Sequence, residues 1–176
     1  VPVAGALRKE QGWDPYNATS LGAGGILGMH RHLNGTTPQL LVAHGSDIYL
    51  GDDSLGTFTS VYSSMTPGYQ TYFDTWKNFA FIVNGIDQPL KWDGTSVLTM
   101  GNAPKGAKFV VHYADRLFMP VGDDDVRFSE LLDPDTWQDP ETGITNNIDV
   151  ETGDDQEITG IYATQTKLVI LKSKSY

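Results

Sequence analysis

The sequence predicts an all-β protein, arranged as a β-propeller-like array of four-stranded antiparallel blades. One observation is a unit that recurs along the chain: a short strand, a tight turn, a second strand rich in branched apolar residues, and then glycine or a polar turn. The second is the spacing of equivalent turn residues, which is 40, 37 and 51 positions between Gly45, Gly85, Gly122 and Ser173. Propeller blades repeat at about 40–45 residues. The third is composition, because 19 glycines, nine prolines and 19 aromatic residues favour strands and turns.

The strands can be placed unit by unit. The first unit has strands at 26–33, 39–43, 47–50 and 58–62, with a turn at Asn34-Gly35. The second has strands at 71–76, 79–83, 88–92 and 96–100, with a turn at Lys77-Asn78. The third has strands at 107–113, 116–119, 126–129 and 147–150, with a turn at Ala114-Asp115. The fourth has two strands, 159–164 and 167–171, with a turn at Gln165-Thr166.

About three and a half blades are therefore expected, as part of a larger ring. Their approximate bounds are 26–66, 67–104, 105–155 and an incomplete 156–176. Residues 1–25 are an N-terminal extension, or return to supply the missing outer strands of the fourth blade. The second strand of each unit, such as 40–43 and 168–171, is a continuous apolar run. Such runs indicate strands that are covered on both faces, as between neighbouring blades.

Composition excludes several classes of function. The 22 acidic residues against 12 lysines and arginines give a formal net charge of −10, which repels a nucleic-acid phosphate backbone. The absence of cysteine excludes disulfides, thiolate metal sites and cysteine nucleophiles. No stretch approaches the ~18 apolar residues of a membrane span. We expect no nucleic-acid partner, no membrane contact and no cofactor.

Several stretches resemble the propeller-type structural proteins of tailed bacteriophages. They are 39–53 (QLLVAHGSDIYLGDD), 56–60 (GTFTS), 84–94 (NGIDQPLKWDG), 103–106 (APKG), 115–120 (DRLFMP), 127–137 (RFSELLDPDTW), 148–150 and 158–171. The resemblance implies a non-catalytic virion protein of the tail or head-to-tail junction. Such a protein is assembled in the host cytoplasm, with copies of itself and other virion proteins as partners. Members of that family are usually longer than this chain.

The extra length of the third unit falls in one loop, 130–146, which is a candidate contact site. Its interface candidates are Leu131, Leu132, Pro134 and Trp137. An exposed tryptophan fenced by proline and acidic residues is suited to anchoring a protein interface or stacking on a sugar. The alternative is that Trp137 folds inward to plug the blade.

The same loop contains acidic residues that arginines of its own unit can hold. Arg116 and Arg127 are candidates for structural ion pairs with Glu130 and Asp133, because guanidinium groups bind carboxylates in a bidentate fork.

Two other functions remain open. One is a carbohydrate-binding or receptor-binding propeller of a tail tip, with Trp76, Trp92 and Trp137 as stacking surfaces on a surface glycan. The other is a sialidase-like glycoside hydrolase, since residues 52–58 faintly echo the aspartate turn of sialidase blades. That chemistry needs an arginine cluster, and the available arginines are Arg8, Arg31, Arg116 and Arg127, in different units.

Histidines and acidic runs suggest metals only weakly. His30 and His32 alternate along one strand and share a face, but two ligands do not make a site, and hydrogen-bonded core histidines are the favoured interpretation. The runs Asp52-Asp53, Asp123-Asp124-Asp125 and Asp154-Asp155 lack the ligand order of a calcium loop. We interpret them as solvated turns.

Overall fold

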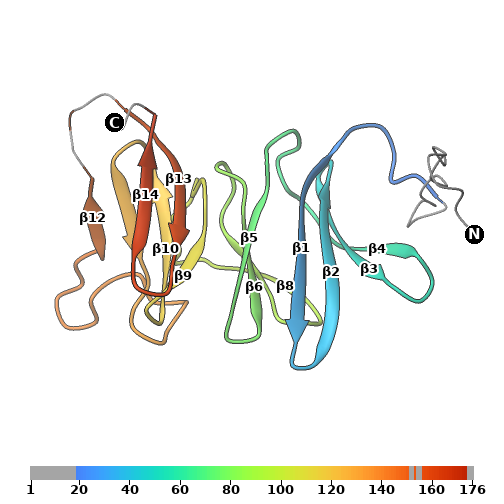
Figure 1. Cartoon of the computed structure of the whole chain (residues 1–176), viewed down its shortest axis with the longest axis horizontal. Coiled ribbons are helices and arrows are strands. Elements are labelled where there is room, and N and C mark those ends of the chain that lie inside the picture. The colour runs from blue at the N-terminus through green and yellow to red at the C-terminus, as the bar shows by residue number, and fades with distance from the viewer. Residues whose placement is uncertain (1–18, 151–152, 154–155, 174–176) are drawn as a thin grey trace, which may run out of the picture.

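A computed structural model describes residues 19–150, 153 and 156–173, and this part of the chain is all-β, as predicted. Its strands form four antiparallel sheets, with four, four, four and two strands (Figure 1). Sheet 1 comprises β1 (Ile26–Asn34), β2 (Thr37–His44), β3 (Asp47–Asp52) and β4 (Thr57–Ser63). Sheet 2 comprises β5 (Tyr72–Trp76), β6 (Phe79–Val83), β7 (Leu90–Trp92) and β8 (Val97–Thr99). Sheet 3 comprises β9 (Val111–Tyr113), β10 (Arg116–Val121), β11 (Asp125–Phe128) and β12 (Asn147–Asp149). Sheet 4 comprises β13 (Ile158–Ala163) and β14 (Leu168–Lys172).

Within each sheet, every strand pairs with the strand that follows it in the sequence. All fourteen predicted strands are found, with bounds that differ by a few residues. The largest difference is at β9, which begins at Val111 rather than Ala107. The first predicted turn is also displaced by one position: Asn34 pairs with Thr37, so the two turn residues are Gly35 and Thr36. None of the described residues forms a helix that could cross a membrane.

Two of the hairpins have turns with left-handed backbone at both central residues. Lys77 and Asn78 have φ of 51° and 63°, and Ala114 and Asp115 have φ of 47° and 56°. This is the type I′ turn, whose twist matches the twist of the flanking strands. These tight turns hold the first two strands of sheets 2 and 3 in register.

Consecutive sheets stack face to face through their second strands. In β6, Ala80 and Ile82 face sheet 1, whereas Phe81 and Val83 face sheet 3, and all four are buried. In β10, Leu117 and Met119 face sheet 2, while Phe118 faces sheet 4. Because both faces are covered, these strands are continuous apolar runs, as predicted from the sequence.

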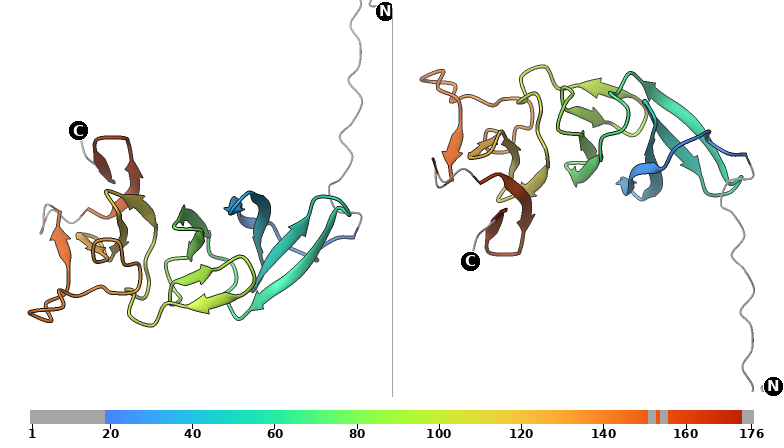
Figure 2. Two further views of the ribbon diagram at one scale, coloured as in Figure 1. Left: turned by 90° about the horizontal axis from the view of Figure 1, so that it is seen from below. Right: turned by 90° about the horizontal axis from the view of Figure 1, so that it is seen from above.

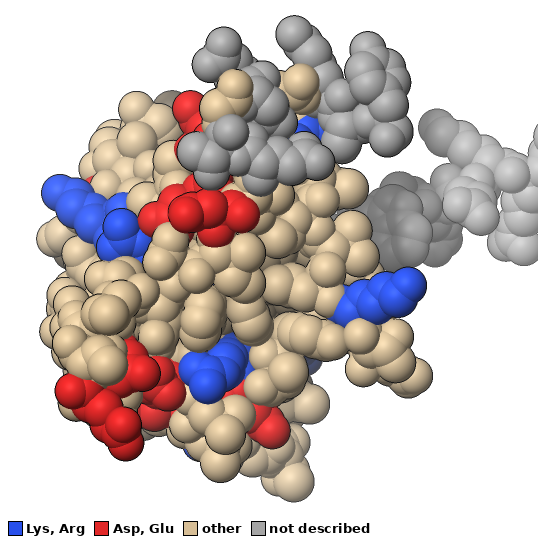
Figure 3. Space-filling model, turned by 90° about the vertical axis from the view of Figure 1, so that its left-hand side faces the viewer, with Lys and Arg blue, Asp and Glu red and all other residues tan. Residues whose placement is uncertain are grey.

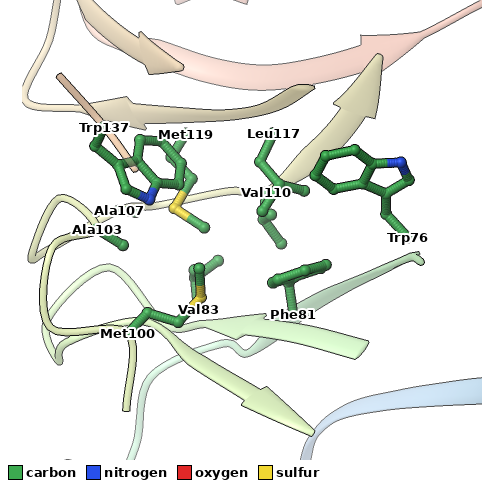
Figure 4. Close-up of a cluster of buried hydrophobic side chains, with 10 residues drawn as sticks. All are labelled: Trp76, Phe81, Val83, Met100, Ala103, Ala107, Val110, Leu117, Met119 and Trp137. Carbon is green, nitrogen blue, oxygen red and sulfur yellow. The ribbon is translucent and has the colours of Figure 1, made fainter. Parts of the chain in front are cut away.

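Three apolar clusters fill the spaces between neighbouring sheets. The cluster between sheets 1 and 2 is built around Leu41, Ile48 and Trp92, and the cluster between sheets 3 and 4 around Phe118, Val126 and Ile158. The middle cluster, between sheets 2 and 3, is drawn in Figure 4, where Phe81 and Val83 face the side chains of Leu117 and Met119. Each pair of neighbouring sheets therefore has its own apolar core.

The first strands of the four sheets contact one another in sequence: β1 lies beside β5, β5 beside β9, and β9 beside β13. Each first strand is also the edge strand of its sheet, and β4, β8 and β12 are the opposite edges. Figure 2 shows the four sheets following one another from sheet 1 at one end to sheet 4 at the other. The first strands therefore line one side of the molecule.

The second strand of sheet 4 differs from the prediction. Residues 168–171 are expected to be covered on both faces, but only Leu168 and Ile170 pack against sheet 3. Val169 and Leu171 face the other way and are exposed. Within the described residues no further sheet covers that side, so burial alternates along β14.

We expect Ala114→Gly to stabilise the protein by about 0.5–1 kcal/mol, because alanine is strained at a positive φ and glycine is not. Urea denaturation measures the change. Ala163→Gly, at the end of β13, is the matched control and should destabilise by a similar amount, because glycine weakens an extended strand. Destabilisation by both substitutions would contradict the assigned turn.

Candidate interaction surface

The loop 130–146 is anchored where it leaves β11. The Ser129 hydroxyl is buried and accepts a hydrogen bond from the Leu117 N–H at 3.0 Å, and the Ser129 N–H donates to the Leu117 carbonyl at 2.9 Å. Arg116 Nη1 donates to the Ser129 carbonyl at 2.7 Å. The start of the loop is thereby fixed to β10, one of the two inner strands of sheet 3.

Glu130 then ties the two ends of the loop together. Its N–H donates to the Thr136 carbonyl at 2.7 Å, and its Oε1 accepts from Asn146 Nδ2 at 2.6 Å. Its Oε2 lies 3.6 Å from Arg116 Nη1. The carboxylate of Glu130 therefore connects the arginine of β10 with the far end of the loop, and the loop is a closed, bonded structure.

Trp137 points into the core, so it is not the exposed anchor that the sequence suggested. Its side chain is 3% exposed, and in Figure 4 it lies beside Met119 and Ala103. Its Nε1 donates to the Pro134 carbonyl at 2.9 Å, and Pro134 is itself buried. Of the two alternatives for Trp137, the structure has the inward plug, and neither residue is presented to a partner.

Leu131 and Leu132 are adjacent apolar side chains that the loop exposes, and Ile144 near its other end is exposed as well. Leu132 has a φ of 60°, and its N–H donates to the Asp115 carbonyl at 2.9 Å. Its carbonyl accepts a hydrogen bond from Lys77 Nζ of sheet 2. Two exposed leucines on a backbone fixed by such bonds form a preorganised apolar contact, which costs little ordering entropy on binding.

The predicted ion pairs are only partly formed. Arg116 pairs with Glu130, as predicted, and also lies over the ring of Phe128. Arg127 instead pairs with Asp125 of its own strand, at 2.9 Å, because both side chains project from the same face of β11 two residues apart. Of the two arginines, only Arg116 therefore holds the loop.

Asp133 also differs from the prediction, because its carboxylate is held by its own loop. Oδ1 accepts from the Asp135 N–H at 2.9 Å, and this bond is the main cause of a lowered pKa for Asp133. Among the described residues, no arginine lies within ion-pair distance of Asp133.

The side chains needed for the two carbohydrate functions are not available in the places expected. Trp76 and Trp92 are buried, as Trp137 is, so none of the three can stack on a sugar. The three described arginines occupy separate ion pairs, in which Arg31 binds Asp53 of sheet 1 and the other two bind within sheet 3. Within the described residues there is no arginine cluster of the sialidase kind. Arg8 lies outside them.

His30 and His32 share the face of β1 that meets sheet 2, where both approach the Thr75 hydroxyl, at 2.6 and 3.3 Å. Burial is the main cause of a lowered pKa for each, and the proximity of Asp74 opposes it for His30. No group of three potential ligands gathers around a metal position in the described part of the chain. These are hydrogen-bonded core histidines, the interpretation that the sequence favours.

Acidic residues in the turns cap main-chain N–H groups. Asp52 accepts from the hydroxyl and N–H of Ser54, at 2.7 and 2.8 Å, and these bonds lower its pKa. Asp93 accepts hydrogen bonds from the N–H groups two and three residues further along its turn, and Asp139 does so in its own turn. These bonds lower the pKa of both carboxyl groups. Their role is structural. The run Asp154-Asp155 lies outside the described residues.

A groove on the side lined by first strands is a feature that the strand pattern alone did not reveal. It has a volume of about 490 Å³ and runs between β5, the segment that leads into β9, and β13. Tyr72 and Phe109 stand on its wall with ring centroids 4.7 Å apart, and Tyr162 lies on the opposite strand. A second hollow of about 340 Å³ shares Tyr72 and Phe109 and adds Tyr69 and Asn84. The sequence signal that could have indicated this groove is the presence of aromatic residues, Tyr72 and Phe109, near the start of two successive units.

No family model matches the chain, and comparison with curated proteins finds no significant similarity. The functional conclusion therefore depends on the arrangement of the sheets and on the surfaces described above.

We expect Trp137→Ala to lower the free energy of unfolding by about 3–5 kcal/mol, because it leaves a cavity between sheets 2 and 3. Leu131→Ala, in the same loop but exposed, is the control and should change stability by less than about 0.5 kcal/mol. Chemical denaturation distinguishes the two. Equal and small effects would mean that Trp137 is not part of the core.

The two core histidines make stability depend on pH. Since their pKa values are below the ordinary 6.5, the unfolded chain binds more protons than the folded one as the pH falls through 6.5. The two neutral imidazoles contribute fully to the free energy of unfolding above pH 6.5. That contribution is lost as the pH falls toward their lower pKa values in the folded protein. Urea denaturation should give a falling free energy of unfolding between pH 7 and 5.

The variant His30→Gln/His32→Gln should flatten this part of the profile. The loss at lower pH should remain in the variant and serves as an internal control, because the lowered pKa values of Asp52, Asp93 and Asp139 stabilise the folded state only while these groups are ionised. An unchanged slope between pH 7 and 5 would assign that dependence to other groups.

Proposed function

We propose that this chain is part of a β-propeller that serves as a non-catalytic structural protein of a phage virion, in the tail or the head-to-tail junction. The observation that carries the proposal is the contact between first strands of successive sheets, β1 with β5, β5 with β9 and β9 with β13. In a propeller the first strand of every blade lies at the central channel, and blades stack face to face around it. The three interfaces of this chain follow that pattern.

The virion assignment is supported by the sequence resemblance, which covers most of the chain from Gly25 onward. It is also supported by what the conspicuous polar residues do. The described arginines form ion pairs, the turn aspartates cap N–H groups, and the strand histidines bond to Thr75. Polar residues that are engaged in structural bonds of this kind suit a protein that acts by assembly with copies of itself and other virion proteins.

The loop 130–146 is the surface through which we expect a neighbouring virion protein to bind. Its exposed leucines, Leu131 and Leu132, lie on a bonded backbone, the ammonium group of Lys77 bonds to the Leu132 carbonyl, and the same loop carries the charged side chain of Asp135, which pairs with Lys91. An apolar pair with charged residues around it is typical of a protein interface with a dry centre and a polar rim.

Immunogold electron microscopy of purified virions, with antibody raised against this chain, tests the proposal directly. Gold at the tail or neck is the expected result, and intact-mass spectrometry of the same virions should give a mass at or above 19.3 kDa for the labelled protein. The matched control is the same antibody after absorption with the purified chain. Virions without label would contradict the virion role.

Carbohydrate binding is a second candidate, favoured by the groove beside Tyr72 and Phe109. Aromatic rings with a polar rim bind sugar faces by stacking. A glycan array with the purified chain tests it. Binding that is lost in Tyr72→Ala and kept in Leu98→Ala, a substitution of an exposed residue on β8, would support this function, and an array without signal would dispose of it.

A further inference from the structure

We propose that the uncovered face of sheet 4 binds the uncovered face of sheet 1 in a second copy of this chain, so that copies associate head to tail. The inference deepens the assembly role proposed above and rests on it. We call the side of each sheet that faces the next sheet its forward face, and the side that faces the preceding sheet its backward face.

The forward face of sheet 4 is built like the forward faces inside the protein. Counting from the hairpin turns, Val169 occupies the position of Phe81 in sheet 2 and Phe118 in sheet 3. Leu171 occupies the position of Val83. The pairing registers place Tyr162 opposite Val169 and Gly160 opposite Leu171, so Tyr162 shares this face.

The forward face of sheet 4 is exposed to solvent, whereas the forward face of sheet 2 is buried. Phe81 is 0% exposed and Val83 is 2% exposed, whereas Val169 is 37% exposed and Leu171 is 51% exposed. Burying an apolar side chain of this size is worth about 1.5–3 kcal/mol. The same positions that seal the internal interfaces are therefore left open at sheet 4. Figure 3 views the end of the molecule that carries sheets 3 and 4, where uncharged residues make up most of the visible described surface and charges gather in separate groups.

Every internal forward face is covered by the backward face of the next sheet, and the described residues leave one backward face partly open: Val42, which pairs with Met29 on that face, is buried, whereas the part nearer the first hairpin turn is exposed. This backward face belongs to sheet 1. Leu40 of β2 occupies the position of Ile82 in sheet 2 and Met119 in sheet 3, both of which are buried. Met29 and Leu33 of β1 project on the same side as Leu40 and are exposed. A second copy therefore supplies the kind of surface that covers the other forward faces.

Charge supports the same pairing. Within the chain, the first hairpins of sheets 1 and 2 each meet the connection between the third and fourth strands of the next sheet. Asn34 lies against Gly94 in this way, and Lys77 donates to Leu132. The first hairpin of sheet 4 carries Lys167, and the corresponding turn of sheet 1 carries Asp52. Head-to-tail packing with the internal geometry brings the lysine of one copy to the aspartate of the next.

Sheets 4 and 1 lie at opposite ends of the molecule (Figure 1), so one copy can bind two neighbours. An interface between unlike surfaces is heterologous, and it generates a ring if the rotation closes and an open filament if it does not. Both products are forms of assembly that suit a virion component.

Sedimentation velocity over a concentration series, up to about 100 μM, tests the proposal, since a micromolar interface is populated there. We expect the wild-type chain to associate. Val169→Lys/Leu171→Lys removes the forward contact, and Met29→Lys/Leu33→Lys removes the backward contact. Each variant alone should be monomeric, with association weakened at least about tenfold. Leu98→Lys/Ile144→Lys, at exposed residues away from both faces, is the control and should associate like the wild type.

Mixing the two interface variants provides the decisive measurement. Each retains one intact face, so a 1:1 mixture should form a heterodimer and nothing larger. Circular dichroism of each variant establishes that it is folded. The proposal is overturned if the wild-type chain stays monomeric, as it would if another segment of the protein covers these faces. It is also overturned if both variants associate normally or if the mixture stays monomeric.

The result is independent of the virion test. Head-to-tail association together with unlabelled virions would overturn the virion role and leave this inference standing. A monomeric chain together with labelled virions would do the reverse.

Discussion

The constraint on which the structure depends is that the second strand of each sheet is apolar on both sides. A four-stranded sheet with Phe81 and Val83 on one face and Ala80 and Ile82 on the other cannot be stable in water alone, because only a neighbour on each side removes these side chains from solvent. The face-to-face stacking, the three clusters and the contact between first strands all follow from that requirement.

Polar groups then fix the angle and register at which the sheets meet. Lys172, which is buried in β14, donates to Asp124 at 2.6 Å and to the Val150 carbonyl at 2.9 Å, so it joins sheet 4 to sheet 3. Asp87 accepts from the N–H and hydroxyl of Thr66, and so joins the second sheet to the segment that precedes it. Buried charges are costly unless they are paired, and such pairs disfavour other arrangements of the sheets.

The loop 130–146 of sheet 3 combines apolar packing with polar bonds. Its tryptophan contributes to the core, whereas Glu130 and Arg116 close its base. On the outside, Leu131 and Leu132 form a short apolar patch on a backbone held by main-chain hydrogen bonds. Because stability and contact surface come from different residues of one loop, a partner surface can vary there without loss of the fold.

The sequence by itself determined the repeat, the fourteen strands and the positions of the turns at Lys77-Asn78 and Ala114-Asp115, because alternation, apolar runs and turn residues act over a few neighbouring positions. It also indicated that His30 and His32 are core residues. Only the tertiary structure decided that Trp137 is buried, that Arg127 pairs with Asp125 rather than with the loop, and that β14 is open on one side. Each of these depends on which distant segment lies opposite a side chain. Local sequence carries no information on that until the sheets are stacked.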